Sequence, residues 1–208
     1  MPQAPLDCAD EDHFWAGARA AERFFMGQSE VQKALTKLVE NLDRDRIPYA
    51  VIGAMALNEF GYQRTTVDVD VLLTAEGLSA FKARHLGRGY VEKFSGSRGL
   101  RDTEHGVDID VVLAGSYPGD GKPKPVAFPD PATAAQRGTR IALLPLAVFV
   151  ELKLASGLTA PDRLKDLADV QEIIRLRQLP RTLANELNPF VRDKYLELWD
   201  AVEERRNA

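Results

Sequence analysis

Two short segments of the chain each carry a pair of aspartates separated by one residue. Asp68 and Asp70 lie in VDVDVLL, and Asp108 and Asp110 lie in VDIDVVL. In a β-strand, residues i and i+2 point to the same face, so each pair would present two carboxylates on one face and valine or isoleucine on the other. If the two strands are neighbours in a sheet, up to four carboxylates share one patch.

Carboxylates held this close repel one another unless a cation lies between them. Because few His or Cys residues are near, the oxygen donors predict a hard cation, Mg²⁺ or Mn²⁺, rather than zinc. The alternative is a half-exposed sheet with solvent-facing aspartates, which is ordinary for one such strand and less so for two. An EF-hand is excluded, because Leu72 occupies the next ligand position and no loop glycine follows.

The residues that precede the first pair suit a phosphate group. Gly53 ends an apolar strand, and the helix expected after it would present free backbone N–H groups and a positive end. Arg64, Thr65 and Thr66 then lead into the acidic strand and supply a cation and two hydroxyls. The alternative for the glycine is a simple tight turn. A P-loop is excluded, because GDGKPK lacks the upstream glycine and the Ser/Thr, and no G-x-G-x-x-G is present.

The elements that must position these residues follow from periodicity and turn residues. We expect helices over 13–27, 29–46, 54–61 and 77–87, strands over 47–53, 67–73 and within 90–113, a loop over 116–131, an edge strand over 139–145, and helices from 146 to 205. The predicted fold class is α/β (α+β), a small mixed sheet with flanking helices followed by a C-terminal helical bundle. We expect residues 1–46 to be a helical segment packed on the core, 47–144 an α/β domain and 145–208 a helical domain.

Composition narrows the class of protein. The 208 residues, 45% hydrophobic and 28% charged, are ordinary for a globular protein. A net charge of −4 gives no broad basic surface for nucleic acid. The single Cys8 excludes an internal disulfide and suits a reducing compartment. No signal pattern or bilayer-length apolar run is present, so we expect a cytoplasmic protein without a membrane partner.

These features together resemble the DNA polymerase β-like nucleotidyltransferases. Gly53 and Ala54 are followed, after thirteen residues, by Asp68-Val-Asp70, as in the family pattern of strand, Gly-Gly or Gly-Ser, short helix and D-x-D. GYQRTTVDVDVLL is similar to the bacterial branch that includes abortive-infection and toxin–antitoxin nucleotidyltransferases. LPLAVFVELKLASGLTAPDRLKDLADVQEII resembles the later motif of that branch, so the likeness covers roughly residues 47–175. Ala54 departs from the usual second Gly or Ser, and the loop 115–131 does not align.

The resemblance assigns roles to the acids. Asp68 and Asp70 would hold the metal ions, Mg²⁺ or Mn²⁺. Asp110 is favoured as the third ligand, because it precedes Val-Val-Leu as the family's third acid does. Asp108 shares its face and could replace it.

The resemblance also assigns nucleotide contacts. Gly53 and Ala54 would lie over the triphosphate, with Arg64, Thr65 and Thr66 beside them, and Lys153 would reach it from the helical half. Asp166 and Asp169 match the acids of the later motif. Their alternative is a solvated helix face on which Lys165 and Asp169 form an i,i+4 pair.

The implied activity is transfer of a nucleoside monophosphate from an NTP to a hydroxyl acceptor, with release of pyrophosphate. The RNA or tRNA 3′ end is favoured as acceptor, in a toxin-like enzyme with a cognate antitoxin as partner. The alternatives are an inactive nucleotidyltransferase-like binding or antitoxin protein, and an antibiotic or protein nucleotidyltransferase. The lone His105 is interpreted as a turn or surface residue, since nothing pairs it with a nucleophile. The base, the acceptor and the oligomeric state do not follow from the sequence.

Overall fold

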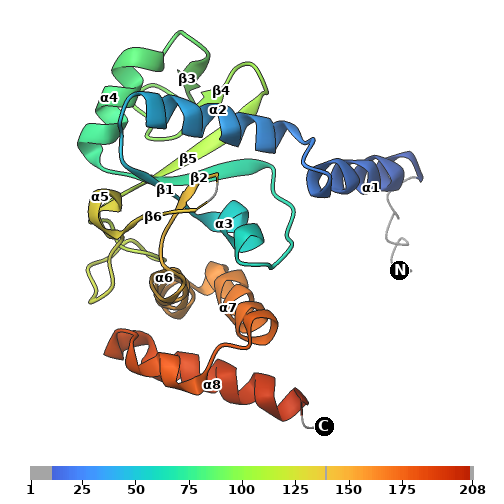
Figure 1. The fold of residues 1–208 in the computed structure, drawn as a ribbon, viewed down its shortest axis with the longest axis vertical. Coiled ribbons are helices and arrows are strands. Elements are labelled where there is room, and N and C mark those ends of the chain that lie inside the picture. The colour runs from blue at the N-terminus through green and yellow to red at the C-terminus, as the bar shows by residue number, and fades with distance from the viewer. Residues whose placement is uncertain (1–10, 139, 207–208) are drawn as a thin grey trace, which may run out of the picture.

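The computed structural model describes residues 11–138 and 140–206, which fold around one mixed β-sheet (Figure 1). The strands are β1 Tyr49–Val51, β2 Asp68–Leu73, β3 Tyr90–Glu92, β4 Leu100–Asp102, β5 Val107–Leu113, β6 Gln136–Arg137 and β7 Ala142–Leu143. The α-helices are α1 Glu11–Phe25, α2 Glu30–Arg44, α3 Gly53–Glu59, α4 Ala75–His85, α5 Pro131–Ala134, α6 Leu146–Thr159, α7 Leu164–Arg177 and α8 Pro189–Arg206. Short 3₁₀ helices span Pro161–Arg163 and Arg181–Asn185.

The two acidic strands are neighbours at the centre of the sheet. The strand order is β3-β4-β5-β2-β1-β7-β6, with β2 parallel to β5. Asp68 lies opposite Asp108 and Asp70 lies opposite Asp110. The alternation of each strand therefore places all four aspartates on one face, as the spacing predicts.

The opposite face of these strands forms the first hydrophobic core. Val69, Val71 and Ile109 are at most 1% exposed and belong to one cluster with the apolar residues of α2 and α4. Helix α2 begins at a capping box, in which the Ser29 hydroxyl accepts from the backbone N–H of Gln32. Its apolar residues recur at helical spacing and face the sheet.

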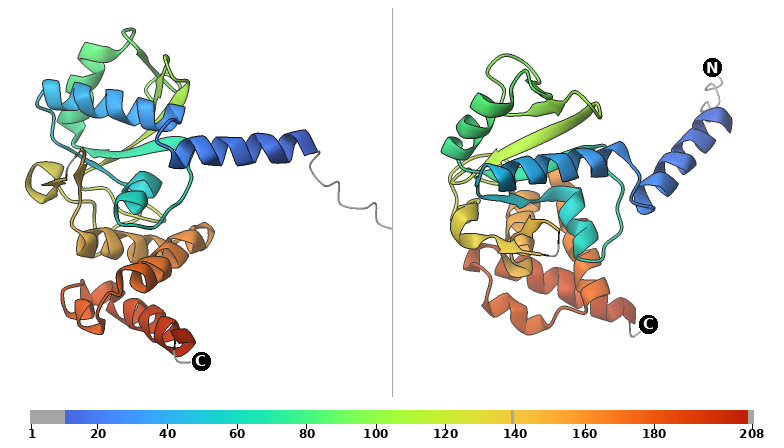
Figure 2. Two further views of the ribbon diagram at one scale, coloured as in Figure 1. Left: turned by 45° about the vertical axis from the view of Figure 1, so that its right-hand side comes forward. Right: turned by 45° about the horizontal axis from the view of Figure 1, so that its top comes forward.

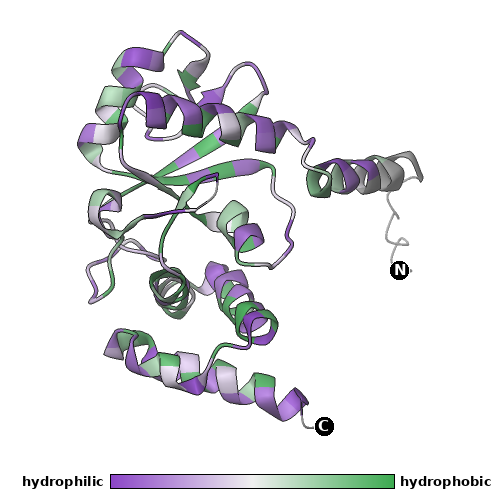
Figure 3. Ribbon diagram, in the orientation of Figure 1, coloured by the Kyte–Doolittle hydropathy of each residue, from purple (hydrophilic) through white to green (hydrophobic). Residues whose placement is uncertain are grey.

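The second core lies between the other face of the sheet and the C-terminal helices α6, α7 and α8. Ala50 and Leu72 from the sheet, Leu154 from α6 and Val170 from α7 are fully buried in one cluster. Figure 3 shows α6, the innermost of these helices, as hydrophobic around much of its circumference. Among the residues described, no helix is both long and apolar enough to cross a membrane.

The predicted fold class is confirmed, since a mixed sheet with flanking helices is followed by a set of C-terminal helices. Three details differ. The strand expected at the edge, β7, lies between β1 and β6, because β6 pairs outside it. Residues 181–185 form a 3₁₀ helix in place of the α-helix expected there. Helix α1 extends away from the body, whereas α2 packs on the sheet (Figure 2). The domain boundaries stay a prediction, and the second core joins residues from both sides of position 144.

A buried ion pair joins α2 to the end of β4, the strand that precedes β5 in the chain. The Lys37 ammonium donates to Asp102 Oδ1 at 2.6 Å, and the Asp102 side chain is 0% exposed. The second oxygen, Asp102 Oδ2, has no hydrogen-bond partner in the described part of the chain. Lys37 is therefore the counter-charge that allows this carboxylate to be buried on β4.

Replacing Lys37 with methionine should leave that carboxylate buried without its counter-ion. We expect Lys37→Met to lower the free energy of unfolding by about 3 kcal/mol, measured by urea denaturation at neutral pH. The double variant Lys37→Met, Asp102→Asn should recover at least half of the loss, because no charge then remains buried. Unchanged stability in the single variant would show that the carboxylate is solvated by other means.

Candidate active site

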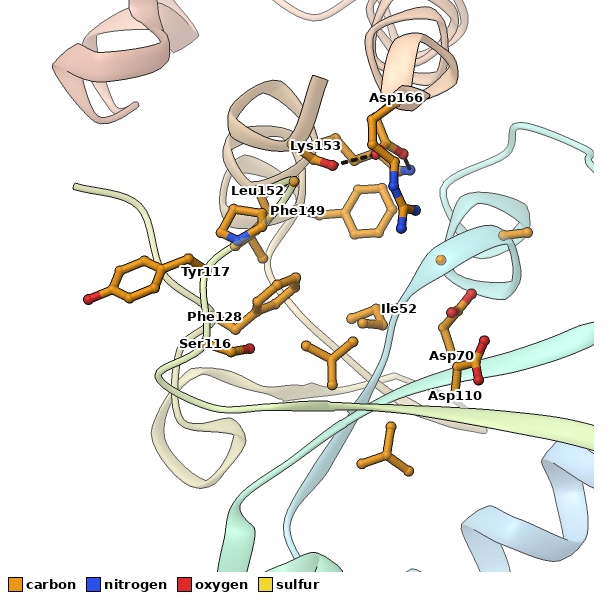
Figure 4. A pocket seen from close by; sticks show the side chains of 18 of the residues that line it. Ile52, Asp70, Asp110, Ser116, Tyr117, Phe128, Phe149, Leu152, Lys153 and Asp166 are labelled. Atoms are coloured by element: carbon orange, nitrogen blue, oxygen red, sulfur yellow. Dashed lines mark hydrogen bonds and ion pairs between the residues drawn. The ribbon is translucent and has the colours of Figure 1, made fainter. Parts of the chain in front are cut away.

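Three of the four aspartates line a cavity of about 850 Å³ between the sheet and the C-terminal helices (Figure 4). Asp68, Asp70 and Asp110 face it, and Figure 4 shows Asp70 beside Asp110 on the adjacent strands. Asp108 does not line the cavity. Its carboxylate instead contacts the Arg101 guanidinium at 2.7 Å and the Lys93 ammonium at 3.2 Å.

Asp70 is the most perturbed of these acids. Burial, followed by the charges of Asp68 and Asp110, raises the pKa of Asp70 from 3.8 to about 6. Gly53 lies directly against this carboxylate, with φ of +63°, and a Cβ atom there would fall 1.9 Å from Asp70 Oδ2. Only glycine fits this position. The Thr66 hydroxyl donates to Asp68 Oδ1, which orients the neighbouring acid.

The donor chemistry of this face fits a hard divalent cation. The carboxylates that would hold it are partly buried, and the raised pKa of Asp70 reflects this burial first and then the charges of Asp68 and Asp110, which a cation would offset. The side chains are not arranged as a metal-coordination site. Within residues 11–138 and 140–206, no three His, Cys, Asp or Glu side chains lie close enough together to hold a metal ion. Asp110 Oδ1 instead lies 2.8 Å from the Lys93 ammonium. The metal ligands, including the choice between Asp110 and Asp108, therefore stay a prediction.

The opposite wall of the cavity is built on a buried charge network. Lys153 on α6 donates to Asp166 Oδ1 at 2.7 Å and to Asp169 Oδ2 at 2.8 Å. Arg64 donates to both oxygens of Asp169, at 2.7 and 2.9 Å, and the Ser156 hydroxyl donates to Asp166. Burial opposes ionisation of Asp166, but the charge and hydrogen bond of Lys153 hold the pKa of that carboxyl below its usual value.

This network changes how the two acids of the later motif are understood. Asp166 and Asp169 are 8% and 3% exposed, so they do not form a solvated helix face. Asp169 pairs with Lys153 and Arg64, and the pair with Lys165 that helical spacing suggests is not formed. The acids therefore hold Lys153 and Arg64 at the cavity.

The remaining predicted residues divide into two groups. Gly53, Ala54, Arg64, Thr66 and Lys153 line the cavity. Thr65 is exposed and Asp169 lies behind the cations, so neither lines it. His105 lies in the turn between β4 and β5, where its Nδ1 is 2.9 Å from Glu30 Oε2.

Sequence reasoning missed the cations on the hairpin before β5. Lys93 and Arg101 contact the acids, and Arg98 lines the cavity. Pairing residues 100–102 with 107–109 across a turn places Arg101 opposite Asp108, and this cross-strand register could have indicated one of them. No spacing in the sequence indicates Lys93. Its contact with the acids depends on the path of the turn between β3 and β4, which the sequence pattern does not give.

Sequence reasoning also missed the apolar end of the cavity. Phe149 and Leu152 from α6, Phe128 from the loop before α5, and Ile52 line this end, and Figure 4 shows Phe128 and Phe149 between the acids and the loop. Lys124, 6% exposed, holds the loop by donating to the Pro118 carbonyl and to Asp120, both at 2.5 Å. The segment that did not align is therefore an ordered wall of the cavity.

Comparison with known proteins finds solved structures of similar fold and low sequence identity. No protein-family model and no curated protein matches the chain. Among solved structures, ANT(2″)-Ia in complex with adenylyl-2″-tobramycin is 13% identical at a TM-score of 0.47, over 84% of this chain and 97% of that chain. An antigenic nucleotidyltransferase-like protein from Paracoccidioides brasiliensis is 18% identical at 0.47, over 71% and 76%. JHP933 from Helicobacter pylori is 14% identical at 0.45, over 83% and 89%. TM-scores below 0.5 at these identities carry no conclusion about function.

The raised pKa of Asp70 predicts how stability depends on pH. The folded protein binds this proton more tightly than the unfolded chain, so the stability that it contributes is present below about pH 4 and is lost as pH rises through about 6. Asp70→Asn lacks this loss. In buffers with a chelator, we expect the variant to gain about 2 kcal/mol over the parent between pH 4 and pH 7, measured by urea denaturation. Parallel pH profiles for the two proteins would contradict the raised pKa of Asp70.

Proposed function

We propose that this chain is a metal-dependent nucleotidyltransferase, which moves a nucleoside monophosphate from an NTP to a hydroxyl acceptor and releases pyrophosphate. The observation that carries the proposal is the pairing of β2 with β5, which puts Asp68, Asp70 and Asp110 on one wall of a cavity. Lys153 and Arg64 stand on the facing wall. A polyphosphate could bind between these two walls, because the acids would hold divalent cations on one side of it and the positive side chains would contact it from the other.

The cavity offers a separate place for each part of a nucleotide. Lys153, Arg64 and Lys165 supply positive charge for the triphosphate, and Gly53, without a side chain, leaves room for the Asp70 carboxylate. The apolar end formed by residues such as Phe128 can cover a base. A volume of about 850 Å³ is within the usual range for a ligand of this size.

In the reaction, Asp68, Asp70 and Asp110 would hold Mg²⁺ or Mn²⁺. Asp108 is the alternative to Asp110 as the third ligand. Such a cation, when bound, neutralises phosphate charge and lowers the pKa of the acceptor hydroxyl. The chain's own contribution is position: Thr66 orients Asp68, and Asp166 and Asp169 fix the direction of Lys153. Because this transfer depends mostly on positioning and charge neutralisation, no histidine is required.

For the acceptor we favour the 3′ end of RNA or tRNA, in a toxin-like cytoplasmic enzyme with a cognate antitoxin. The support is the resemblance of GYQRTTVDVDVLL to the bacterial toxin branch, and the exposed cations Arg98 and Arg163 at the cavity. An antibiotic or protein hydroxyl is the alternative acceptor, and an inactive binding or antitoxin protein is the alternative function.

The central experiment is incubation with Mg²⁺ or Mn²⁺ and each α-labelled NTP, with RNA, protein and small-molecule acceptors in parallel. We expect label to enter one acceptor class while pyrophosphate appears. Asp68→Asn should reduce the rate by about 100-fold or more, as expected when charge stabilisation of the transition state is lost. Its circular dichroism should match the parent, since Asp68 faces the cavity and not a core. The proposal fails if no NTP is bound or transferred with any acceptor.

A second prediction tests phosphate binding without disturbing the buried network. Lys165 is exposed, lines the cavity and makes no ion pair within the described ranges, so its loss should leave the fold unchanged. Lys165→Met should weaken the affinity for a fluorescent NTP by about threefold, the effect of one partly screened charge. Lys194→Met on α8 makes the same change in net charge away from the cavity and should have no effect. If the two variants bound the fluorescent NTP with equal affinity, the triphosphate would not lie beside Lys165.

A further inference from the structure

A lysine from outside the predicted motifs lies on the acids that would hold the metal. Lys93 follows β3, and its ammonium donates to Asp110 Oδ1 at 2.8 Å and lies 3.2 Å from Asp108 Oδ2. The Lys93 side chain is 29% exposed and the Asp110 side chain is 47% exposed, so the contact is open to solvent and its attraction is partly screened. The hydrogen bond to Asp110 raises the pKa of Lys93, which therefore carries a full positive charge at neutral pH.

The hairpin that carries Lys93 is held in place by its own contacts. Lys82 on α4 donates to Glu92 at 2.6 Å and to the Ser97 carbonyl at 2.5 Å. The Glu92 carboxylate also accepts from the backbone N–H of Gly96 at 2.8 Å. The turn is thus anchored at both ends, and the position of the ammonium follows from an ordered backbone.

Gly99 provides the space through which Lys93 reaches the acids. A Cβ atom at this position would lie 2.7 Å from Lys93 Cδ, closer than two carbon atoms can approach, and 3.5 Å from Asp110 Oδ1. The lysine side chain therefore passes directly over the bare glycine. Because Cδ belongs to a flexible side chain, an alanine here would displace the lysine and leave the backbone in place.

We infer that Lys93 is an internal counter-ion that competes with divalent cations for Asp110, and thereby sets the metal affinity of the site. The positive charge of the ammonium, 2.8 Å from Asp110 Oδ1, repels a divalent cation and occupies one direction of approach to that oxygen, so a cation binds more tightly when Lys93 is displaced. Arg101 contributes a second positive charge, but its ion pair among the described residues is with Asp108 and not with Asp110. This inference rests on the proposed function, since it takes the same acids as the metal ligands.

The test is direct titration with Mn²⁺, in which electron paramagnetic resonance reports the free ion and no nucleotide or activity is needed. Lys93→Met should lower the Kd for Mn²⁺ about fivefold, the ratio that corresponds to about 1 kcal/mol. Gly99→Ala should lower it in the same direction while keeping the lysine. Arg101→Met should have a smaller effect, and Lys33→Met, an equal charge change on α2, should have none.

The inference is overturned if Lys93→Met binds Mn²⁺ no more tightly than the parent, or if Arg101→Met and Lys33→Met reproduce its effect. Matching circular dichroism spectra exclude misfolding as the cause of a change. Tighter Mn²⁺ binding without any nucleotide transfer would support the role of Lys93 and reject the proposed enzyme activity. Transfer with an unchanged Mn²⁺ affinity would do the reverse, so the two failures are distinguishable.

Discussion

Electrostatic repulsion between carboxylates on two paired strands is the constraint on which the site depends. Strands β2 and β5 are parallel and in register, so Asp70 must lie beside Asp110 whenever their apolar faces pack on α2 and α4. A slip of β5 by one residue would relieve the repulsion but would turn Ile109 out of the core and Asp110 into it. The hydrophobic core therefore holds like charges together, and burial together with the charges of Asp68 and Asp110 raises the pKa of Asp70.

The molecule balances these acids with positive charge from two directions. From the C-terminal helices, Lys153 is held over the cavity by Asp166 and Asp169, and Asp166 itself lines the cavity. From the edge of the sheet, Lys93 and Arg101 contact the acids directly. The first group faces the cavity at a distance from the acids and suits a polyphosphate, whereas the second shares the oxygens that a metal would need.

The cavity itself depends on the second core, which joins the sheet to α6, α7 and α8. Leu72 and Leu154 bury the middle of this interface, and the charged network of Lys153 lies at its border with the cavity. These helices thus do two things: they complete the fold and they supply one wall of the site. The loop 116–131, which Lys124 holds through its hydrogen bonds, closes the apolar end of the cavity. The sheet, the C-terminal helices and this loop, which are far apart in the sequence, therefore enclose one cavity.

The sequence alone determined the acidic strands, the face shared by Asp68 and Asp70, the glycine beside them and the mixed fold class, because strand periodicity and turn chemistry are local. It also indicated Lys153, through a motif. Tertiary structure decided that Asp166 and Asp169 act as internal partners, that Thr65 faces solvent, and that Lys93 lies on Asp110. These depend on which side chains meet across a hairpin or between helices, and such contacts join residues whose separation along the chain has no fixed relation to their distance in space.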